Sequence, residues 1–161
     1  MVIWILGMSG SGKTTLAKKI LQKSKIKKII HIDGDTIRRI YSDKLGHTLS
    51  DRRINAERIS KLVKYISDQK ITVVVSVLSN FPAWLNWNRK YIKNYYEVFL
   101  NTNFDILKKR KKLLYSKKIK NVIGIDLKFN RPKKSDLVIN NCNNLVELNK
   151  FAKKIIKKIK D

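Results

Sequence analysis

The chain has 161 residues, 43% of them hydrophobic, and a formal net charge of +25, with one cysteine and two histidines. This length predicts one domain, large enough to be stable without disulfides or metals. Cys142 has no partner for a disulfide, and one cysteine with two histidines excludes a cysteine-rich zinc site. The early apolar run, residues 2–6, is far too short to cross a membrane, and no basic segment precedes it as in a signal peptide. We therefore expect a cytoplasmic protein without a membrane partner.

Lysine and arginine total 37 against 12 acidic residues, and the basic excess is densest after residue 105. Such a charge is compatible with nucleic acid, an anionic membrane surface or a polyanionic small substrate. The sequence is also rich in Lys, Ile and Asn, as in proteins of AT-rich genomes, and it has no aromatic–basic RNA-binding motif or zinc finger. We interpret the charge as a solvated basic surface and expect no nucleic-acid partner.

Apolar runs alternate with helical patterns, which is typical of an α/β fold with a parallel sheet. The run at residues 71–77 is continuous and rich in β-branched side chains, as expected of a central buried strand. The last helix repeats apolar residues at threes and fours, and Asn143 or Asn144 is placed to cap it. No linker or repeat divides the chain, so we predict a single domain over residues 1–161. The expected strands are 2–6, 28–32, 71–77, 97–100 and 136–139, and the expected helices are 14–23, one from about residue 50, 103–115 and the C-terminal one.

Residues 7–14 read Gly-Met-Ser-Gly-Ser-Gly-Lys-Thr and match G-x-x-x-x-G-K-[ST] between a predicted strand and a predicted helix. Glycines let such a loop curl so that its N–H groups and the helix N-terminus face phosphate oxygens. Lys13 is placed to reach the β- and γ-phosphates of ATP, and the Thr14 hydroxyl to hold Mg²⁺. The alternative, a chance glycine-rich turn, is disfavoured by the strand and helix on either side. We predict that ATP is bound by Gly7, Ser9, Gly10, Ser11, Gly12, Lys13, Thr14 and Thr15.

ATP binding alone does not specify a reaction. The chain lacks the guanine-selecting N-K-x-D of GTPases, and its central strand reaches Ser76 where a motor or helicase has an acidic residue. A small kinase remains. The segment Asp33-Gly34-Asp35 follows the second predicted strand, at the edge where open α/β sheets bind ligands. Two carboxylates there can orient a hydroxyl nucleophile and help position the metal; the alternative is a turn with a helix cap at Asp35.

Four segments, GMSGSGKTT, DGDTIRR, LGHTLSDRRINAER and SVLS, resemble the adenylyl-sulfate kinases, and their spacing agrees without a gap from Gly7 to Ser79. The later segments LLY at 113–115, GID at 124–126 and SDLVIN at 135–140 are similar to the same family. The resemblance covers most of the chain. It implies a P-loop NTPase fold and an ATP-dependent kinase that transfers the γ-phosphate to the 3′-hydroxyl of a nucleotide.

The resemblance also implies roles for single residues. Asp33 matches the general base for the acceptor hydroxyl, and Lys13, on the phosphates, is the second predicted catalytic residue. Arg58 matches the second arginine of the family's N-I-R-R, and Ser79 matches a serine beside the phosphates. For the arginines, the alternative is a solvated helix surface. The implied substrate contacts are Asp33, Asp35, Arg38, Arg52, Asn55 and Ser79.

Departures from the family pattern concern the acceptor base. The two phenylalanines that sandwich adenine in the family align with His47 and Val122, and the lid, residues 116–134, is shorter. Glu57 occupies the position of the first arginine of the family's N-I-R-R. Residues 80–81, Asn-Phe, occupy the positions of the family's Pro-Tyr. Stacking is worth about 1–3 kcal/mol per base, so its loss weakens adenine selection. A family branch that phosphorylates cytidine diphosphoramidate, for bacterial capsules, needs a pocket for a smaller base. Both acceptors, adenylyl sulfate and cytidine diphosphoramidate, stay open.

We predict a five-stranded parallel sheet of order 2-3-1-4-5 flanked by helices, with lid lysines 117, 118 and 120 closing over the phosphates. The alternative from another class is a nucleic-acid-binding P-loop ATPase, motivated by the charge. An aromatic run has near-helical spacing, and we interpret it as packing, with a homodimer interface as the alternative. It comprises Phe81, Trp84, Trp87, Tyr91 and Tyr95.

Overall fold

The computed structural model describes residues 1–41, 44–78, 81–116, 119–140 and 145–160. Its strands form one parallel sheet of order β2-β3-β1-β4-β5, which confirms the predicted topology. The strands are β1 (Val2–Leu6), β2 (Ile29–Asp33), β3 (Thr72–Val77), β4 (Tyr95–Asn101) and β5 (Leu137–Asn140). The helices are α1 (Lys13–Lys23), α2 (Gly34–Ile40), α3 (Leu49–Asp68), α4 (Pro82–Tyr91), α5 (Phe104–Arg110) and α6 (Leu145–Lys160).

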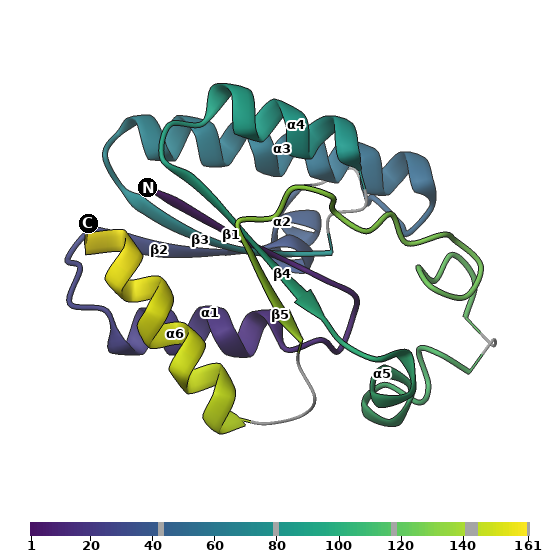
Figure 1. Cartoon of the computed structure of the whole chain (residues 1–161). Helices are drawn as coiled ribbons and strands as arrows, with labels where there is room; N and C mark the ends of the chain where they lie inside the picture. The colour runs from purple at the N-terminus through teal and green to yellow at the C-terminus, as the bar shows by residue number, and fades with distance from the viewer. Residues whose placement is uncertain (42–43, 79–80, 117–118, 141–144, 161) are drawn as a thin grey trace.

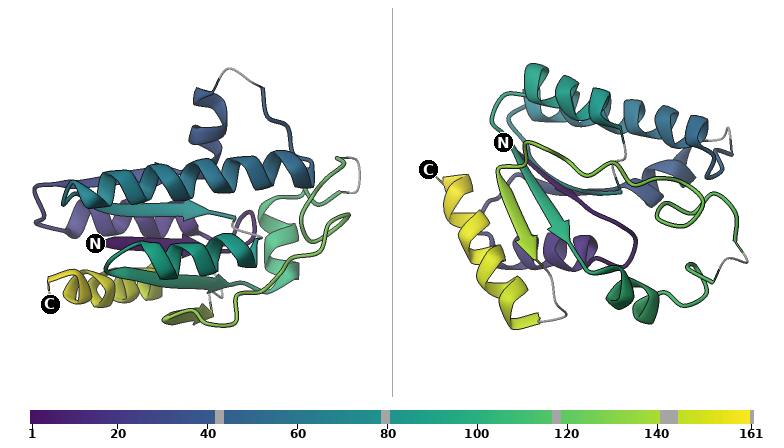
Figure 2. Two further views of the ribbon diagram at one scale, coloured as in Figure 1. Left: turned by 90° about the horizontal axis from the view of Figure 1, so that it is seen from above. Right: turned by 45° about the vertical axis from the view of Figure 1, so that its right-hand side comes forward.

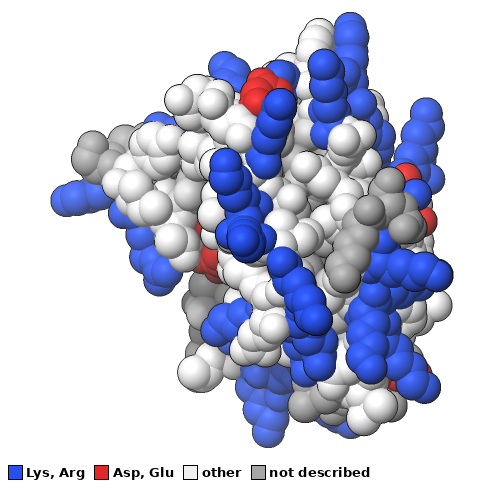
Figure 3. All heavy atoms as spheres, turned by 90° about the vertical axis from the view of Figure 1, so that its left-hand side faces the viewer, with Lys and Arg blue, Asp and Glu red and all other residues white. Residues whose placement is uncertain are grey.

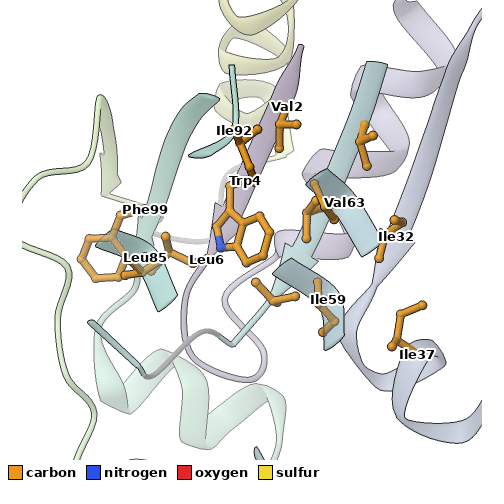
Figure 4. Packing of buried hydrophobic residues seen from close by; sticks show 13 residues of the cluster. Val2, Trp4, Leu6, Ile32, Ile37, Ile59, Val63, Leu85, Ile92 and Phe99 are labelled. Atoms are coloured by element: carbon orange, nitrogen blue, oxygen red, sulfur yellow. The ribbon is translucent and has the colours of Figure 1, made fainter. Parts of the chain in front are cut away.

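Helices cover both faces of the sheet: α3 and α4 lie on one face, and α1 and α6 on the other (Figures 1 and 2). Every residue of β1 is buried, because its side chains alternate between two cores. Val2, Trp4 and Leu6 face the α3–α4 side, with the Trp4 ring in the middle of that cluster (Figure 4), whereas Ile3 and Ile5 pack under α1 and α6. The sheet therefore holds the ends of its central strands rigidly in place.

Two helices lie where the sequence pattern predicted none. The first, α2, has only seven residues and one buried side chain, Ile37, so it carries no periodic signal. The second, α4, coincides with the aromatic run and begins at Pro82, which suits a first helical position. Conversely, the helix expected over 103–115 ends at Arg110, and the chain continues in turns to residue 115.

The lid is built around a tight turn. The Val122 carbonyl oxygen accepts hydrogen bonds from the backbone N–H groups of Ile125, Asp126 and Leu127, and the Asp126 carboxylate accepts one from the Val122 N–H at 3.0 Å. Val122 packs with Leu107 and Tyr115 in a small separate core. Downstream, residues 129–136 return along β4 to the start of β5 (Figure 1). This turn fixes where the lid meets the body of the protein.

The aromatic run divides between the core and the surface. Trp87 and Tyr95 pack against the α3–α4 core, as predicted, and the Trp87 ring lies between those of Trp84 and Tyr91, at 5.6 and 5.0 Å. Tyr91 is 45% exposed. Phe81 instead lines the cleft described below. A homodimer through this surface stays a prediction.

Basic side chains cover the face shown in Figure 3, where acidic ones are few. Both Lys18 and Lys157 are exposed, on α1 and α6 respectively. This agrees with the interpretation of the charge as a solvated surface. Within the described part of the chain, no helix has the length and apolar character needed to span a bilayer. Cys142 and the predicted caps, residues 143 and 144, lie outside the described residues.

Candidate active site

A cleft of about 690 Å³ opens at the carboxyl ends of β1, β2 and β3. One wall is the loop between β1 and α1, the opposite wall is α3, and residues 119–123 of the lid close a third side. Ligands bind at this edge in open α/β sheets because the loops there leave the sheet in opposite directions. Of the predicted site residues, Ser9, Gly10, Gly12, Lys13, Thr14, Thr15, Asp33, Asp35, Arg38, Arg52 and Asn55 line the cleft.

The glycines of the loop have the backbone conformations that only glycine adopts readily. Gly10 has φ 83° and Gly12, the N-cap of α1, has φ 97°. The helix begins without a side-chain cap and without an acidic residue in its first turn, so its free N–H groups suit an anion. Gly7 and Ser11, also predicted ligands, are buried behind the loop, where a Cβ on Gly7 would lie 2.7 Å from the Leu100 carbonyl oxygen.

Two side chains that the sequence analysis did not select hold this loop from the α5 side. The Tyr115 hydroxyl donates to the Ser9 carbonyl oxygen, and the Arg110 guanidinium to that of Gly10, each at 2.8 Å. With these carbonyls engaged outside, the loop presents its N–H groups inward. Burial raises the pKa of Tyr115 to about 12, so its hydroxyl stays a donor. The resemblance of segment 113–115 to the family was the one signal that pointed to Tyr115.

Lys13 lies at the start of α1 and donates from Nζ to the Met8 carbonyl oxygen at 2.8 Å. Burial lowers the pKa of Lys13 to about 8; Asp35 and Asp33 oppose this shift, and Lys111 adds to it. An ammonium group that has lost hydration is well suited to a polyphosphate, which restores the lost solvation with negative charge. Lys13 thus lines the cleft beside the loop, and its role as the phosphate-binding lysine stays a prediction.

Asp33 ends β2 and acts at once as a cap and as a hydrogen-bond acceptor. Its Oδ1 accepts from the backbone N–H groups of Asp35 and Thr36, at 3.1 and 3.3 Å, so Asp33 is the N-cap of α2. Its Oδ2 accepts from the Ser76 hydroxyl at 2.8 Å and the Thr14 hydroxyl at 3.3 Å. The helix cap that the sequence analysis considered at Asp35 is wrong, because the acidic residue that precedes the helix makes the cap.

The net effect of these contacts is an ionised carboxylate in the cleft. Partial burial acts to raise the pKa of Asp33, but the hydrogen bonds from Ser76, Thr36, Asp35 and Thr14 outweigh it and lower the pKa below its ordinary value. A hydroxyl and a carboxylate 3.3 Å apart, Thr14 and Asp33, are also oxygen groups of the kind that Mg²⁺ prefers. Among the described residues, no cluster of three or more His, Cys, Asp or Glu forms a separate metal site.

Asp35 and Arg38 form an ion pair on α2, with Nη1 3.0 Å from Oδ1. The pair is asymmetric: the Asp35 side chain is 80% exposed, whereas that of Arg38 is 12% exposed and lies in the cleft wall. Because Asp35 lies i−3 to Arg38 on one short helix, it orients the guanidinium. Arg38 is thus held as a cation facing the acceptor side of the cleft.

Arg52 and Asn55 come from α3, which begins at a capping box formed by Thr48 and Asp51. Arg52 donates from Nε to the His47 carbonyl oxygen at 2.9 Å and from Nη2 to the Asn121 carbonyl oxygen at 3.1 Å. The buried Asn55 donates from Nδ2 to the Gly34 carbonyl oxygen at 3.1 Å, which ties α3 to the start of α2. These two side chains join three segments of the cleft that are distant in sequence, and their contact with the acceptor stays a prediction.

His47 and Val122, the positions that align with the family's stacking phenylalanines, both line the cleft. The His47 side chain is largely exposed. The partial loss of its hydration in the cleft and the nearby cations Arg38 and Arg52 lower its pKa, so the ring is neutral near neutral pH. Val122 is 4% exposed, because the small lid core covers most of it. Trp4, Ile59 and Phe81 contribute apolar surface to the same cleft.

Other residues named in the sequence analysis differ in position. Arg58, matched to the second arginine of N-I-R-R, is not among the residues that line the cleft; its guanidinium stacks on the Tyr41 ring at 4.3 Å. Glu57 pairs with Lys61 at 2.6 Å on the surface of α3. Lys120 lines the cleft, as predicted for a lid lysine. Ser79, Asn80, Lys117 and Lys118 lie outside the described residues.

This fold and cleft are those of a P-loop phosphotransferase, with the glycine-rich loop after β1 on one side and residues of α3 on another. The sequence model of the adenylylsulphate kinase family matches residues 1–140. The chain belongs to the adenylylsulphate kinase family, as its motifs suggested.

Individual relatives agree with this assignment. The chain is 39% identical to the cytidine diphosphoramidate kinase of Campylobacter jejuni, over 98% of this chain and 95% of that protein. It is 34% identical to a probable adenylyl-sulfate kinase of Archaeoglobus fulgidus, over 86% of this chain and 94% of that protein. The structure of the Mycobacterium tuberculosis APS kinase in complex with AMPPNP and APS superposes with a TM-score of 0.83, at 27% identity, over 99% of this chain and 97% of that one. The comparisons give no support to the nucleic-acid-binding alternative.

Proposed function

We propose that this protein is an ATP-dependent kinase that transfers the γ-phosphoryl group to the 3′-hydroxyl of cytidine diphosphoramidate. Two observations support this acceptor. The relative at 39% identity, matched nearly end to end, is a cytidine diphosphoramidate kinase. Within the cleft, His47 and Val122 lie at the positions that align with the two phenylalanines of the resembled family, so no pair of phenyl rings is available to sandwich adenine. The second observation carries the proposal, because it concerns the base that the acceptor must present. Since the donor is ATP, the reaction belongs in the cytoplasm.

The loop after β1 offers N–H groups and a positive charge, which suit the phosphates of a nucleoside triphosphate. Backbone N–H groups at the start of α1 and the ammonium of Lys13 would hold the β- and γ-phosphates. Thr14 and Asp33 would hold Mg²⁺, which neutralises phosphate charge and orients the triphosphate when bound. Arg38 and the lid residue Lys120 face the same cleft and add positive charge where the transferred group carries negative charge.

The chemistry needs little beyond position and charge. The 3′-oxygen of the acceptor forms a bond to the γ-phosphorus while the bond from that phosphorus to the β,γ-bridging oxygen breaks, and ADP leaves. The hydroxyl proton passes to the Asp33 carboxylate, which is ionised and fixed by its hydrogen bonds. Because Asp33 also caps α2, the base is held by the backbone and does not depend on a free rotamer.

A second candidate acceptor is adenylyl sulfate, favoured by the family match and by the relatives that are adenylyl-sulfate kinases. The two are separated by supplying each acceptor alone with ATP and Mg²⁺, and measuring kcat/KM by ADP release. Mass spectrometry and phosphorus NMR then locate the new phosphate. The proposal expects a 3′-phosphorylated cytidine diphosphoramidate and a higher kcat/KM for that acceptor. Efficient turnover of adenylyl sulfate with an inert cytidine acceptor would overturn it.

A further inference from the structure

Behind the cleft, three side chains form a continuous hydrogen-bonded chain. His31 Nε2 lies 2.8 Å from Ser76 Oγ, and Ser76 Oγ lies 2.8 Å from Asp33 Oδ2. His31 and Asp33 are alternate residues of β2 and so share one face of the sheet. Asp33 is paired in register with Ser76 on β3, which places the serine between them. Asp33 and Ser76 line the cleft, whereas His31 does not.

The geometry assigns the protons in the two hydrogen bonds that join His31, Ser76 and Asp33. An ionised Asp33 has no proton to give, so the Ser76 hydroxyl must donate to it. Because its proton is used in that bond, Ser76 Oγ can offer His31 only a lone pair, that is, it can only accept. A second lone pair on His31 Nε2 would be repelled at 2.8 Å, so Nε2 must carry a proton and donate it to the serine. The order of donation therefore runs from His31 to Ser76 to Asp33.

This order needs a proton on His31 Nε2, which both the imidazolium and one neutral tautomer carry, and the surroundings favour the neutral ring. Burial lowers the pKa of His31; Asp33, on its own strand, opposes the shift, and Lys18, on α1, adds to it. From β3 it meets Ser76, which is uncharged and 2% exposed. A neutral imidazole that donates from Nε2 leaves Nδ1 without a proton. The ring is therefore a fixed donor to the serine near neutral pH.

We propose that His31 is a positioning residue for phosphoryl transfer: by donating to Ser76, it fixes the serine hydroxyl on Asp33 Oδ2 and so holds that carboxylate in one orientation. The inference rests on the proposed role of Asp33 as the base. Without His31, the Ser76 oxygen loses the N–H donor that holds it in place, so its hydroxyl is less firmly directed at Asp33. The bond that orients the Asp33 carboxylate is then weakened. No contact with either substrate is lost.

A matched pair of variants tests this. His31→Leu removes the donor, and His31→Gln restores an N–H at about the reach of Nε2. With the purified full chain and both substrates, His31→Leu should lower kcat by up to about tenfold, the scale of one hydrogen bond between uncharged groups, and leave both KM values within about twofold. His31→Gln should recover most of the loss.

Ser76→Ala supplies the second arm. It should reproduce the His31→Leu effect, and adding His31→Leu to it should cause no further loss, because the two residues act as one unit. Additive losses, an unchanged kcat in folded His31→Leu, or an effect confined to KM would overturn the inference. Loss of activity in Asp33→Asn with none in His31→Leu would reject the role of His31 and keep the proposed function. Full activity in Asp33→Asn would reject Asp33 as the base.

A measurement that does not depend on catalysis tests the proposed order of donation independently. Nitrogen-15 NMR of the wild-type protein reports which ring nitrogen of His31 carries the proton. The Nε2–H tautomer near neutral pH, with a shifted signal in Ser76→Ala, is expected. An Nδ1–H tautomer would contradict the proposed order of donation, whatever the activities of the variants.

Discussion

Arg52 of α3 donates a hydrogen bond to the backbone carbonyl oxygen of Asn121, 69 residues further along the chain, at 3.1 Å. The same guanidinium donates to the carbonyl oxygen of His47, so it joins the two segments that carry the acceptor-binding wall. Asn121 has φ 62°, the left-handed conformation that asparagine tolerates. The lid is thus joined to the body of the protein at the point where the acceptor base is expected.

The Arg52 bridge predicts an effect on the acceptor and not on ATP. Arg52→Lys keeps the charge but cannot reach both carbonyl oxygens. Charge-assisted hydrogen bonds are worth about 1.5–3 kcal/mol, so we expect KM for the nucleotide acceptor to rise about tenfold or more. KM for ATP should stay unchanged in steady-state assays. Arg53→Lys, on the exposed neighbouring position, is the matched control and should be neutral. An equal rise in KM for ATP would contradict the bridge as a feature of the acceptor wall.

Asp33→Asn separates the chemical role of Asp33 from its structural one. Asparagine caps a helix about as well as aspartate, so thermal unfolding should change little. It cannot accept the hydroxyl proton as a carboxylate does, and general-base contributions are typically about 10²–10⁴-fold, so kcat should fall on that scale. A loss confined to KM would make Asp33 a binding residue and not a base.

The lowered pKa of Lys13 predicts a pH dependence of ATP binding. In the free protein this pKa is about 8. Bound phosphates raise it, so the contribution of Lys13 to binding is complete below about pH 8 and is lost as pH rises through the raised pKa of the complex. Calorimetry with a non-hydrolysable ATP analogue should show Kd rising above pH 8, by up to about tenfold per pH unit, with proton uptake on binding.

Lys13→Arg is the control for this dependence, because an arginine stays protonated over the whole range. Its Kd should be flat between about pH 7 and 9.5, whatever its absolute value. A flat profile for the wild type would show that another group, not Lys13, carries the charge that binds the phosphates.

The two walls of the base pocket should respond differently to aromatic substitution. His47 is exposed in the cleft, so His47→Phe adds a stacking ring without crowding and should raise kcat/KM for adenylyl sulfate by up to about tenfold. Val122 packs with Leu107 and Tyr115, so Val122→Phe should overpack that core and lower the free energy of unfolding by about 1–3 kcal/mol. Acceptor kinetics and thermal unfolding of the single variants measure both. A gain from Val122→Phe with unchanged stability would contradict this packing.

The sheet and the phosphate-binding loop could be predicted because their signals are local. Continuous apolar runs located the strands, and the motif at residues 7–14 located the loop and the helix after it. The short helix α2 could not be found in this way. Its stability comes from the Asp33 cap and one buried residue, Ile37, and a helix of seven residues shows no clear period.

The contacts that order the site are long-range, and composition does not report them. Tyr115 reaches Ser9 across 106 positions, and Ser76 reaches Asp33 across 43 through strand pairing. The family pattern marks Asp33 and Arg52 but does not show that one caps a helix and the other bridges two segments. At Arg58 the residue type matches the family pattern, but the side chain stacks on Tyr41 and does not line the cleft.

The choice of acceptor is tested most directly by internal competition. The protein is given ATP, Mg²⁺ and an equimolar mixture of cytidine diphosphoramidate and adenylyl sulfate, and both 3′-phosphorylated products are quantified by mass spectrometry at low conversion. Their ratio equals the ratio of kcat/KM values, independent of enzyme concentration. We predict an excess of the cytidine product, because His47 and Val122 do not form an aromatic sandwich for adenine. A mixture dominated by the phosphorylated adenylyl sulfate would contradict the account.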